Sequence, residues 1–168
     1  MDTESILAAL ETLGEDARPT LDFLRRHRTR IGFRRQGMGT AAMWTLDGGI
    51  YLNPRHFSPD VRQDDPTLLC LVVHEGCHLR QGPLTALSVY GELEAWQLDL
   101  RLRSALGLPL RHPALVELLG LPLGYDRSVL QCARQLMRAY AGPGYRIDLL
   151  PLYPLLREVR FWITRKEE

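Results

Sequence analysis

The chain has 168 residues and a hydrophobic content of 45%, so it is long enough to bury one sizeable core and too short for two ordinary domains. The 21 basic and 20 acidic residues nearly cancel, which gives no overall attraction to nucleic acid or to an anionic membrane. An odd number of cysteines, an acidic N-terminus and no long apolar run predict a cytoplasmic protein without disulfides, secretory signal or membrane span. We therefore expect a single domain over residues 1–168.

Two helices are expected first. Apolar residues recur at helical spacing over residues 3–13, with Thr3 as a competent N-cap and Gly14 as the end. A second amphipathic segment covers about residues 19–30 and ends in the basic stretch RRHRTRIGFRR. Clustered arginines can bind phosphate or an acidic partner, but the balanced net charge favours a solvated surface here.

Three short segments after residue 31 have the composition of strands. IGFRR, TAAMWTL and IYLN are rich in β-branched or aromatic residues, and the last two flank the hairpin signal Asp47-Gly48-Gly49. A small antiparallel sheet is therefore expected. IYLN is a candidate edge strand along which an extended peptide binds, although it is equally explained as one half of a stabilising hairpin.

The rest of the chain predicts helices. Asp64-Asp65-Pro66 begins a helix that Gly82-Pro83 ends, and its apolar residues leave almost no polar face, so it should be buried. A long helix is expected from about residue 84 to 107, another over 126–140, and a Gly-Pro-Gly turn at 142–144. The expected fold class is α+β, mostly helical, with the sheet packed on the buried helix.

The buried helix contains His74-Glu75-Gly76-Cys77-His78, which fits the pattern H-E-x-x-H. Residues four apart lie on one helix face, so both imidazoles can bind one zinc ion while Glu75 acts on a water molecule beside it. Burial of three ionisable groups in an apolar helix is costly, and a bound Zn²⁺ would offset this cost. The alternative is that the two histidines only hydrogen-bond within the core. The glutamate between them argues against this alternative, because a catalytic metal site requires such a residue.

A catalytic zinc needs a third protein ligand and an open position for water. No other histidine has a matching spacing after the motif, whereas Glu92 and Glu94 follow on the next expected helix. Spacing alone leaves both glutamates open as the ligand.

These residues resemble the gluzincin metallopeptidases, in which an H-E-x-x-H helix is followed by a second helix that supplies a glutamate ligand. The resemblance covers about residues 40–100, and it implies a zincin-like fold, a Zn²⁺ cofactor and peptide hydrolysis. In several such families the ligand begins an E-x-x-A-D element, whose first four positions match residues 92–95, so the resemblance implies Glu92 as the third ligand. Trp96 stands where the family often has an aspartate that orients a ligand histidine, and Asp99, one turn along, is a candidate substitute.

The expected function is zinc-dependent hydrolysis of a peptide or protein, with Glu75 as the base that takes the proton of the attacking water. The tetrahedral intermediate needs a further donor for its oxyanion. The candidates that no spacing argument separates are Tyr145, Tyr125 and His112. Gln81, three residues after His78, is either part of the site or a polar residue at a helix end.

The absence of aspartate at position 96 favours an alternative function. In this alternative the protein is a zinc-binding, non-hydrolytic regulatory or partner-binding module on the same scaffold. The sequence indicates neither the substrate nor the oligomeric state.

Overall fold

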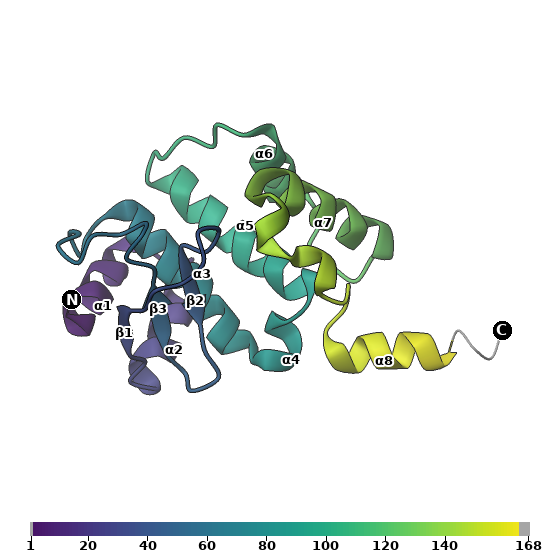
Figure 1. Ribbon diagram of the computed structural model, residues 1–168, viewed down its shortest axis with the longest axis horizontal. Coiled ribbons are helices and arrows are strands. Elements are labelled where there is room, and N and C mark those ends of the chain that lie inside the picture. Colours follow the sequence, from purple (N-terminus) through teal and green to yellow (C-terminus); the bar gives the residue numbers. More distant parts are fainter. Residues whose placement is uncertain (1, 165–168) are drawn as a thin grey trace.

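A computed structural model describes residues 2–164, in which a small sheet lies beside the first helices at one end of the molecule and the last helices lie at the other end (Figure 1). The helices are α1 (Thr3–Leu10), α2 (Arg18–Arg26), α3 (Pro66–Gln81), α4 (Pro83–Ala86), α5 (Val89–Ala105), α6 (Pro113–Gly120), α7 (Arg127–Ala141) and α8 (Leu155–Thr164). The strands are β1 (Ile31–Phe33), β2 (Ala42–Trp44) and β3 (Ile50–Leu52), and 3-10 turns cover Glu11–Leu13, Pro143–Tyr145 and Ile147–Leu149. The fold is α+β and mostly helical, as predicted. In the described part of the chain, no helix combines the length and the apolar character needed to cross a membrane.

The first two helices occupy the predicted segments with different ends. The N-cap of α1 is Asp2 rather than Thr3, because the Asp2 carboxylate accepts hydrogen bonds from the backbone N–H groups of Glu4 and Ser5. A 3-10 turn extends α1 as far as Gly14, whose φ of 81° ends it as expected. Helix α2 ends at Arg26, earlier than predicted, because the backbone turns to a φ of 48° at Arg28.

The sheet has the order β1-β3-β2 and is mixed, not antiparallel as predicted. The hairpin between β2 and β3 is confirmed, with Gly48 at a φ of 83° and its N–H 2.9 Å from the Thr45 carbonyl oxygen. Strand β1 pairs in parallel with the other side of β3. IYLN is therefore the central strand rather than an edge, and β2 is an edge. Hairpin signals are local, so they do not show which side a third strand joins.

Helix α3 is buried, as predicted, and packs against α2, β2 and α5. The Asp65 side chain accepts a hydrogen bond from the Leu68 N–H and caps the helix, and Gly82, at a φ of 73°, ends it. Within the H-E-x-x-H motif, a Cβ on Gly76 would lie 2.5 Å from Cγ2 of Thr20 on α2. The glycine therefore permits close packing of α2 on the motif.

The long helix expected from residue 84 is divided into α4 and α5. Ser88 has an extended backbone between them, and its hydroxyl donates to the Thr85 carbonyl (2.6 Å) and accepts from the Gly91 N–H (3.0 Å). A Cβ on Gly91 would overlap the Thr85 carbonyl group. Serine competes well as an N-cap, so the break places Glu92 in the first turn of α5.

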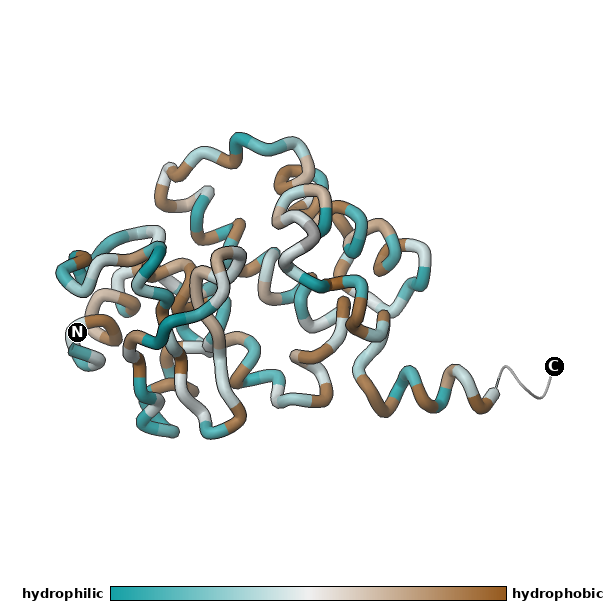
Figure 2. The backbone as a smooth tube through the Cα atoms, in the orientation of Figure 1, coloured by the Kyte–Doolittle hydropathy of each residue, from teal (hydrophilic) through white to brown (hydrophobic). Residues whose placement is uncertain are grey.

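Helix α5 contributes to two hydrophobic clusters. Ala95, Leu98 and Leu102 join the cluster of α1, α2, α3 and the sheet. Its other face joins α6, α7 and the turns after α7 through Val89, Leu93 and Leu100. Helix α6 lies in a proline-rich segment for which no helix was predicted, whereas α7 occupies the segment expected to be helical and is capped by Asp126. Helix α8 extends from the body, and its hydrophobic and hydrophilic residues alternate (Figure 2).

Candidate metal centre

The motif histidines and one glutamate converge between α3 and α5. Nε2 of His74 lies 3.2 Å from Nε2 of His78, and Oε2 of Glu92 lies 3.9 Å and 3.6 Å from these two atoms, respectively. Ligands about 2.0–2.1 Å from a tetrahedral zinc ion are about 3.3 Å apart. The three atoms therefore form a triangle of nearly the size that one zinc ion needs, and both histidines are buried.

Glu94, the competing candidate, points away from this cluster. Its carboxylate lies 3.1 Å from Nη2 of Arg80 and 3.0 Å from Nε2 of Gln81. Side chains two residues apart on a helix point in nearly opposite directions, so only one of the two glutamates can face the histidines. The structure brings Glu92 to the site.

Glu75 lies beside the cluster without belonging to it. Its Oε2 accepts a hydrogen bond of 2.9 Å from the backbone N–H of Trp44 on the edge strand β2. Burial raises the pKa of its carboxyl to about 7. A carboxylate held by the backbone, with a pKa near neutrality, is suited to accept and return a proton.

The ring of His78 has a partner that orients it. Nδ1 of His78 lies 3.1 Å from Oε1 of Gln81. The Gln81 amide donates both of its hydrogens, to the Gly91 carbonyl (2.9 Å) and to Glu94 (3.0 Å). Gln81 is therefore part of the site rather than only a polar helix end.

Trp96 and Tyr145 support the third ligand. Nε1 of Trp96 donates a 2.8 Å hydrogen bond to the Tyr145 hydroxyl, which in turn donates to Oε2 of Glu92. The Trp96 ring also meets the His74 ring edge-on at 5.5 Å. Trp96, at the position where the resemblance implies an aspartate, thus supports Glu92 through Tyr145 rather than a histidine. Sequence spacing gave no signal for this contact, because Tyr145 follows Glu92 by 53 residues.

Asp99 does not replace the missing aspartate. Its Oδ2 accepts a 2.7 Å hydrogen bond from Nε of Arg103, and it forms no hydrogen bond with His74 or His78 among the described residues. Burial raises the pKa of the Asp99 carboxyl, although the positive charge of Arg103 acts to lower it. Asp99 therefore anchors an arginine instead of a metal ligand.

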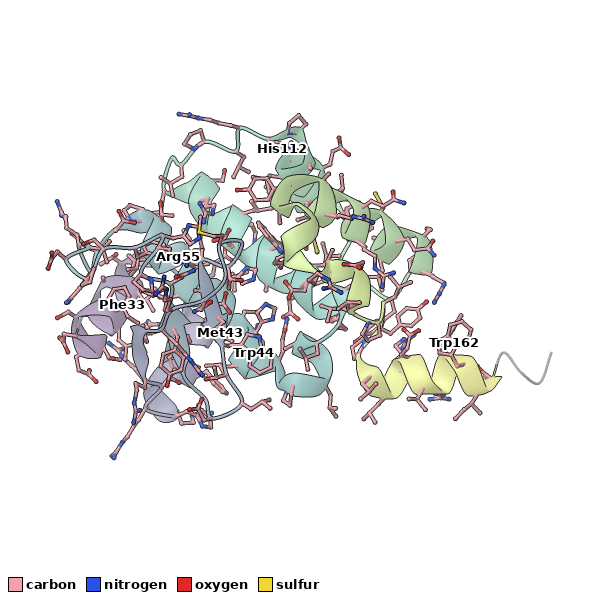
Figure 3. The ribbon with its side chains drawn as sticks, in the orientation of Figure 1. Phe33, Met43, Trp44, Arg55, His112 and Trp162 are labelled. Atoms are coloured by element: carbon pink, nitrogen blue, oxygen red, sulfur yellow. The ribbon has the colours of Figure 1, made fainter. Side chains whose placement is uncertain are left out.

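The three candidate oxyanion donors are separated by the structure. Tyr145 contacts the site directly, as described above. His112 lines the same cleft but caps α6, with Nδ1 accepting from the Ala114 N–H at 3.2 Å (Figure 3). Tyr125 stacks on Tyr90 with ring centroids 4.5 Å apart and is not part of the cleft lining. Tyr145 is the candidate nearest to the ligands.

The ligand cluster holds a proton when no metal is bound. The pKa of His74 is lowered to about 3, first by burial and then by His78. Burial also acts to lower the pKa of His78, but the Glu92 carboxylate outweighs it and raises this pKa to about 9. The proton therefore resides on His78, which can donate it to Nε2 of His74.

A cleft of about 1190 Å³ opens over His74, Glu75, His78 and Glu92. A second cavity of about 620 Å³ adjoins it and shares part of its lining, including Trp44. Trp44 extends from β2 toward the site, and its ring centroid lies 6.2 Å from that of His78 (Figure 3). The site is thus accessible from two directions.

The donor set fits a metal ion. Two imidazole nitrogens and one carboxylate oxygen suit zinc, and three protein ligands leave a coordination position for water. No known protein family, curated protein or solved structure matches the chain.

Proposed function

We propose that the protein is a zinc-dependent peptidase of the gluzincin type with a zincin-like fold. The proposal rests on two features together. Three side chains place their donor atoms in a triangle of nearly the size that one zinc ion needs, and a second glutamate, Glu75, lies beside this triangle without belonging to it. The donor atoms come from His74, His78 and Glu92. The Glu75 carboxylate accepts a hydrogen bond from the backbone N–H of Trp44. A structural zinc site would be closed by a fourth ligand and would need no adjacent base.

The catalytic roles follow from this arrangement. A zinc ion held by these three residues would polarise the substrate carbonyl and make a water molecule more acidic. Glu75 accepts the proton of the attacking water and transfers it to the leaving amine, while the Trp44 N–H holds one carboxylate oxygen in place. Tyr145 keeps Glu92 oriented, and among Tyr145, Tyr125 and His112 it is the candidate oxyanion donor that contacts the ligand cluster.

The outer side of β2 supports binding of an extended peptide. The ladder bonds from Asn53 to Ala41 and from Thr45 to Gly49 show that alternate residues of β2 bond to β3. The backbone groups of Ala42 and Trp44 therefore face away from β3, and both residues line the cleft. Because the Trp44 N–H already bonds to Glu75, a substrate strand can pair with the Trp44 carbonyl and the Ala42 backbone groups next to the metal site.

A non-hydrolytic zinc protein is the second candidate. The observation that favours it is the hydroxyl of Tyr145, whose proton is already donated to Glu92. An oxyanion donor must release this bond during the reaction. In the second candidate, the same bond serves only to hold the metal.

Metal content and turnover test the proposal together. Protein purified without added metal should contain stoichiometric zinc and melt at a lower temperature after chelation. Glu75→Gln should keep the zinc and lose hydrolysis of every peptide in a broad library, whereas Glu92→Gln should weaken zinc binding itself. Absence of zinc would refute both candidates. Stoichiometric zinc without any turnover of the wild type would favour the second one.

A further inference from the structure

The cleft has two arms that meet at the metal site. The hairpin arm, of about 620 Å³, is lined by residues 27–30 and by the turn between β2 and β3. The helix arm is the far part of the larger cleft, along α5 and residues 109–112. Both cavities are lined by Trp44, Thr45, Leu46 and His78. A peptide bound across the metal site would therefore reach into both arms.

Arginines dominate the charge of the hairpin arm. Arg28 and Arg30 line it and are exposed, and neither forms an ion pair with a described residue. The positive φ of Arg28 ends α2, with the Thr29 N–H bonded to the Leu24 carbonyl at 3.0 Å. The acidic side chain in this arm, Asp47, already accepts hydrogen bonds from Thr45 and Gly49.

The helix arm also contains two arginines, of which Arg103 is ion-paired with Asp99. Arg103 is held through Nε by the buried Asp99, and its terminal nitrogens have no hydrogen-bond partner among the described residues. Arg111, which also lines the cleft, is exposed and forms no ion pair in the described part of the chain. Arg103 follows Glu92 by eleven residues of α5, which corresponds to about 16 Å. This distance equals about five residues of an extended peptide.

The charge of the cleft thus differs from that of the whole chain. Beyond Glu75 and Glu92, the two arms contain four arginines and two aspartates, which is a surplus of two positive charges, and Asp99 is ion-paired with Arg103. The chain as a whole has a net charge of only +1. Charge concentrated in a cleft with low-dielectric walls attracts oppositely charged ligands more strongly than the same charge on an open surface.

We propose that the cleft selects peptides with acidic residues on both sides of the scissile bond. This inference rests on the proposed peptidase function and names its substrate class. The helix arm is also lined by Leu71, Leu100, Leu110 and Leu115, which suits the apolar side chains of a peptide better than a phosphate backbone. An acidic peptide is therefore a better match to the cleft than a nucleic acid.

The test compares matched peptides of about a dozen residues with the same apolar centre and with Glu, Gln or Lys in both flanks. The wild-type holoenzyme should show the highest kcat/KM with the Glu peptide, and this preference should weaken as salt is added. Arg103→Gln, and Arg28→Asn combined with Arg30→Gln, should each lower the ratio of kcat/KM for the Glu and Gln peptides, by up to about fivefold per arginine. Asparagine at position 28 tolerates the positive φ there.

The matched control is Arg101→Gln. Arg101 is on α5 as well, but it pairs with Asp16 and does not line the cleft, so this ratio should not change. Zinc-loaded Glu75→Gln protein should bind peptides without hydrolysing them. Fluorescence anisotropy can therefore compare its affinities for the Glu, Gln and Lys peptides.

Equal hydrolysis of the three peptides would overturn the inference and leave the peptidase function intact. Tight, salt-sensitive binding of the Glu peptide without any hydrolysis would overturn the peptidase function and leave the acidic preference intact. An oligonucleotide that displaces the Glu peptide at far lower concentration than unlabelled Glu peptide would show that the arms bind nucleic acid instead.

Discussion

Gln81 determines which nitrogen of His78 faces the metal position. Both amide hydrogens of Gln81 go to acceptors on α5, so the Oε1 atom must face Nδ1 of His78, 3.1 Å away. Oε1 can only accept, which places the hydrogen of a neutral His78 on Nδ1 and leaves the Nε2 lone pair for the metal. One side chain therefore joins the end of α3 to the start of α5 and sets the tautomer of a ligand.

Replacement of Gln81 should weaken zinc binding more than it weakens the fold. Gln81→Leu removes the acceptor for Nδ1 of His78, and loss of such a partner typically lowers metal affinity about 10- to 100-fold. Competition with a chromogenic chelator measures this change. Gln97→Leu is the control, because Gln97 is also buried and donates to two backbone carbonyls, of Leu118 and Leu121, away from the site. If Gln81→Leu and Gln97→Leu lower the zinc affinity equally, Gln81 affects zinc binding only by stabilising the fold.

Zinc binding should release a proton. The pKa of His78 in the metal-free site is about 9, above its usual value, so at neutral pH His78 is protonated and zinc must displace that proton. The apparent zinc affinity should therefore rise about tenfold per pH unit as the pH approaches 9, and level off above it. A pH indicator in weakly buffered solution should report about one proton released per zinc from this residue. Constant affinity between neutral pH and pH 9 would contradict the assigned protonation.

Tyr145→Phe should separate the two roles of the Tyr145 hydroxyl. The variant removes the hydrogen bond to Glu92 and leaves Nε1 of Trp96 without its acceptor. If the hydroxyl positions Glu92, zinc affinity and kcat should both fall, and the affinity loss should be about tenfold or more. A fall in kcat alone, with unchanged zinc affinity, would identify Tyr145 as an oxyanion donor that contributes nothing to the metal site. Tyr125→Phe, outside the cleft lining, should change neither quantity.

The sequence predicts the features of this molecule that depend on neighbouring residues. The helix that bears the motif is bounded by Asp65 and Gly82, and the hairpin is bounded by a glycine turn, so both follow from local chemistry. The convergence of His74 and His78 is also predictable, because the two histidines share one helix face. The choice of Glu92 rather than Glu94 came from the family resemblance and not from spacing.

Features that depend on distant segments could not be predicted in this way. The parallel pairing of β1 with β3 depends on the path of residues 34–41 around the sheet. The contact between Tyr145 and Glu92 depends on how α6 and α7 return the chain to the site. The break before α5 could have been predicted, since Ser88 is a good N-cap with Gly91 three residues later.

Gly91→Ala should damage both the fold and the metal site. A Cβ at position 91 would overlap the Thr85 carbonyl group, so the first turn of α5 must move, and Glu92 lies in that turn. Overpacking of this kind costs about 1–3 kcal/mol, which exceeds the roughly 0.5–1 kcal/mol that alanine gains over glycine in a helix. We expect a lower melting temperature for the metal-free protein and weaker zinc binding, measured by thermal unfolding and chelator competition.

Gly120→Ala provides the comparison for this variant. Gly120 is the last residue of α6, and a Cβ there would meet no atom within 4 Å. This change should leave zinc affinity unaltered and should not lower the melting temperature. If Gly91→Ala instead binds zinc like the wild type while its melting temperature falls, then Glu92 reaches the metal independently of the α4–α5 contact. In that case the positioning of the third ligand depends on Tyr145 and Trp96 rather than on the start of α5.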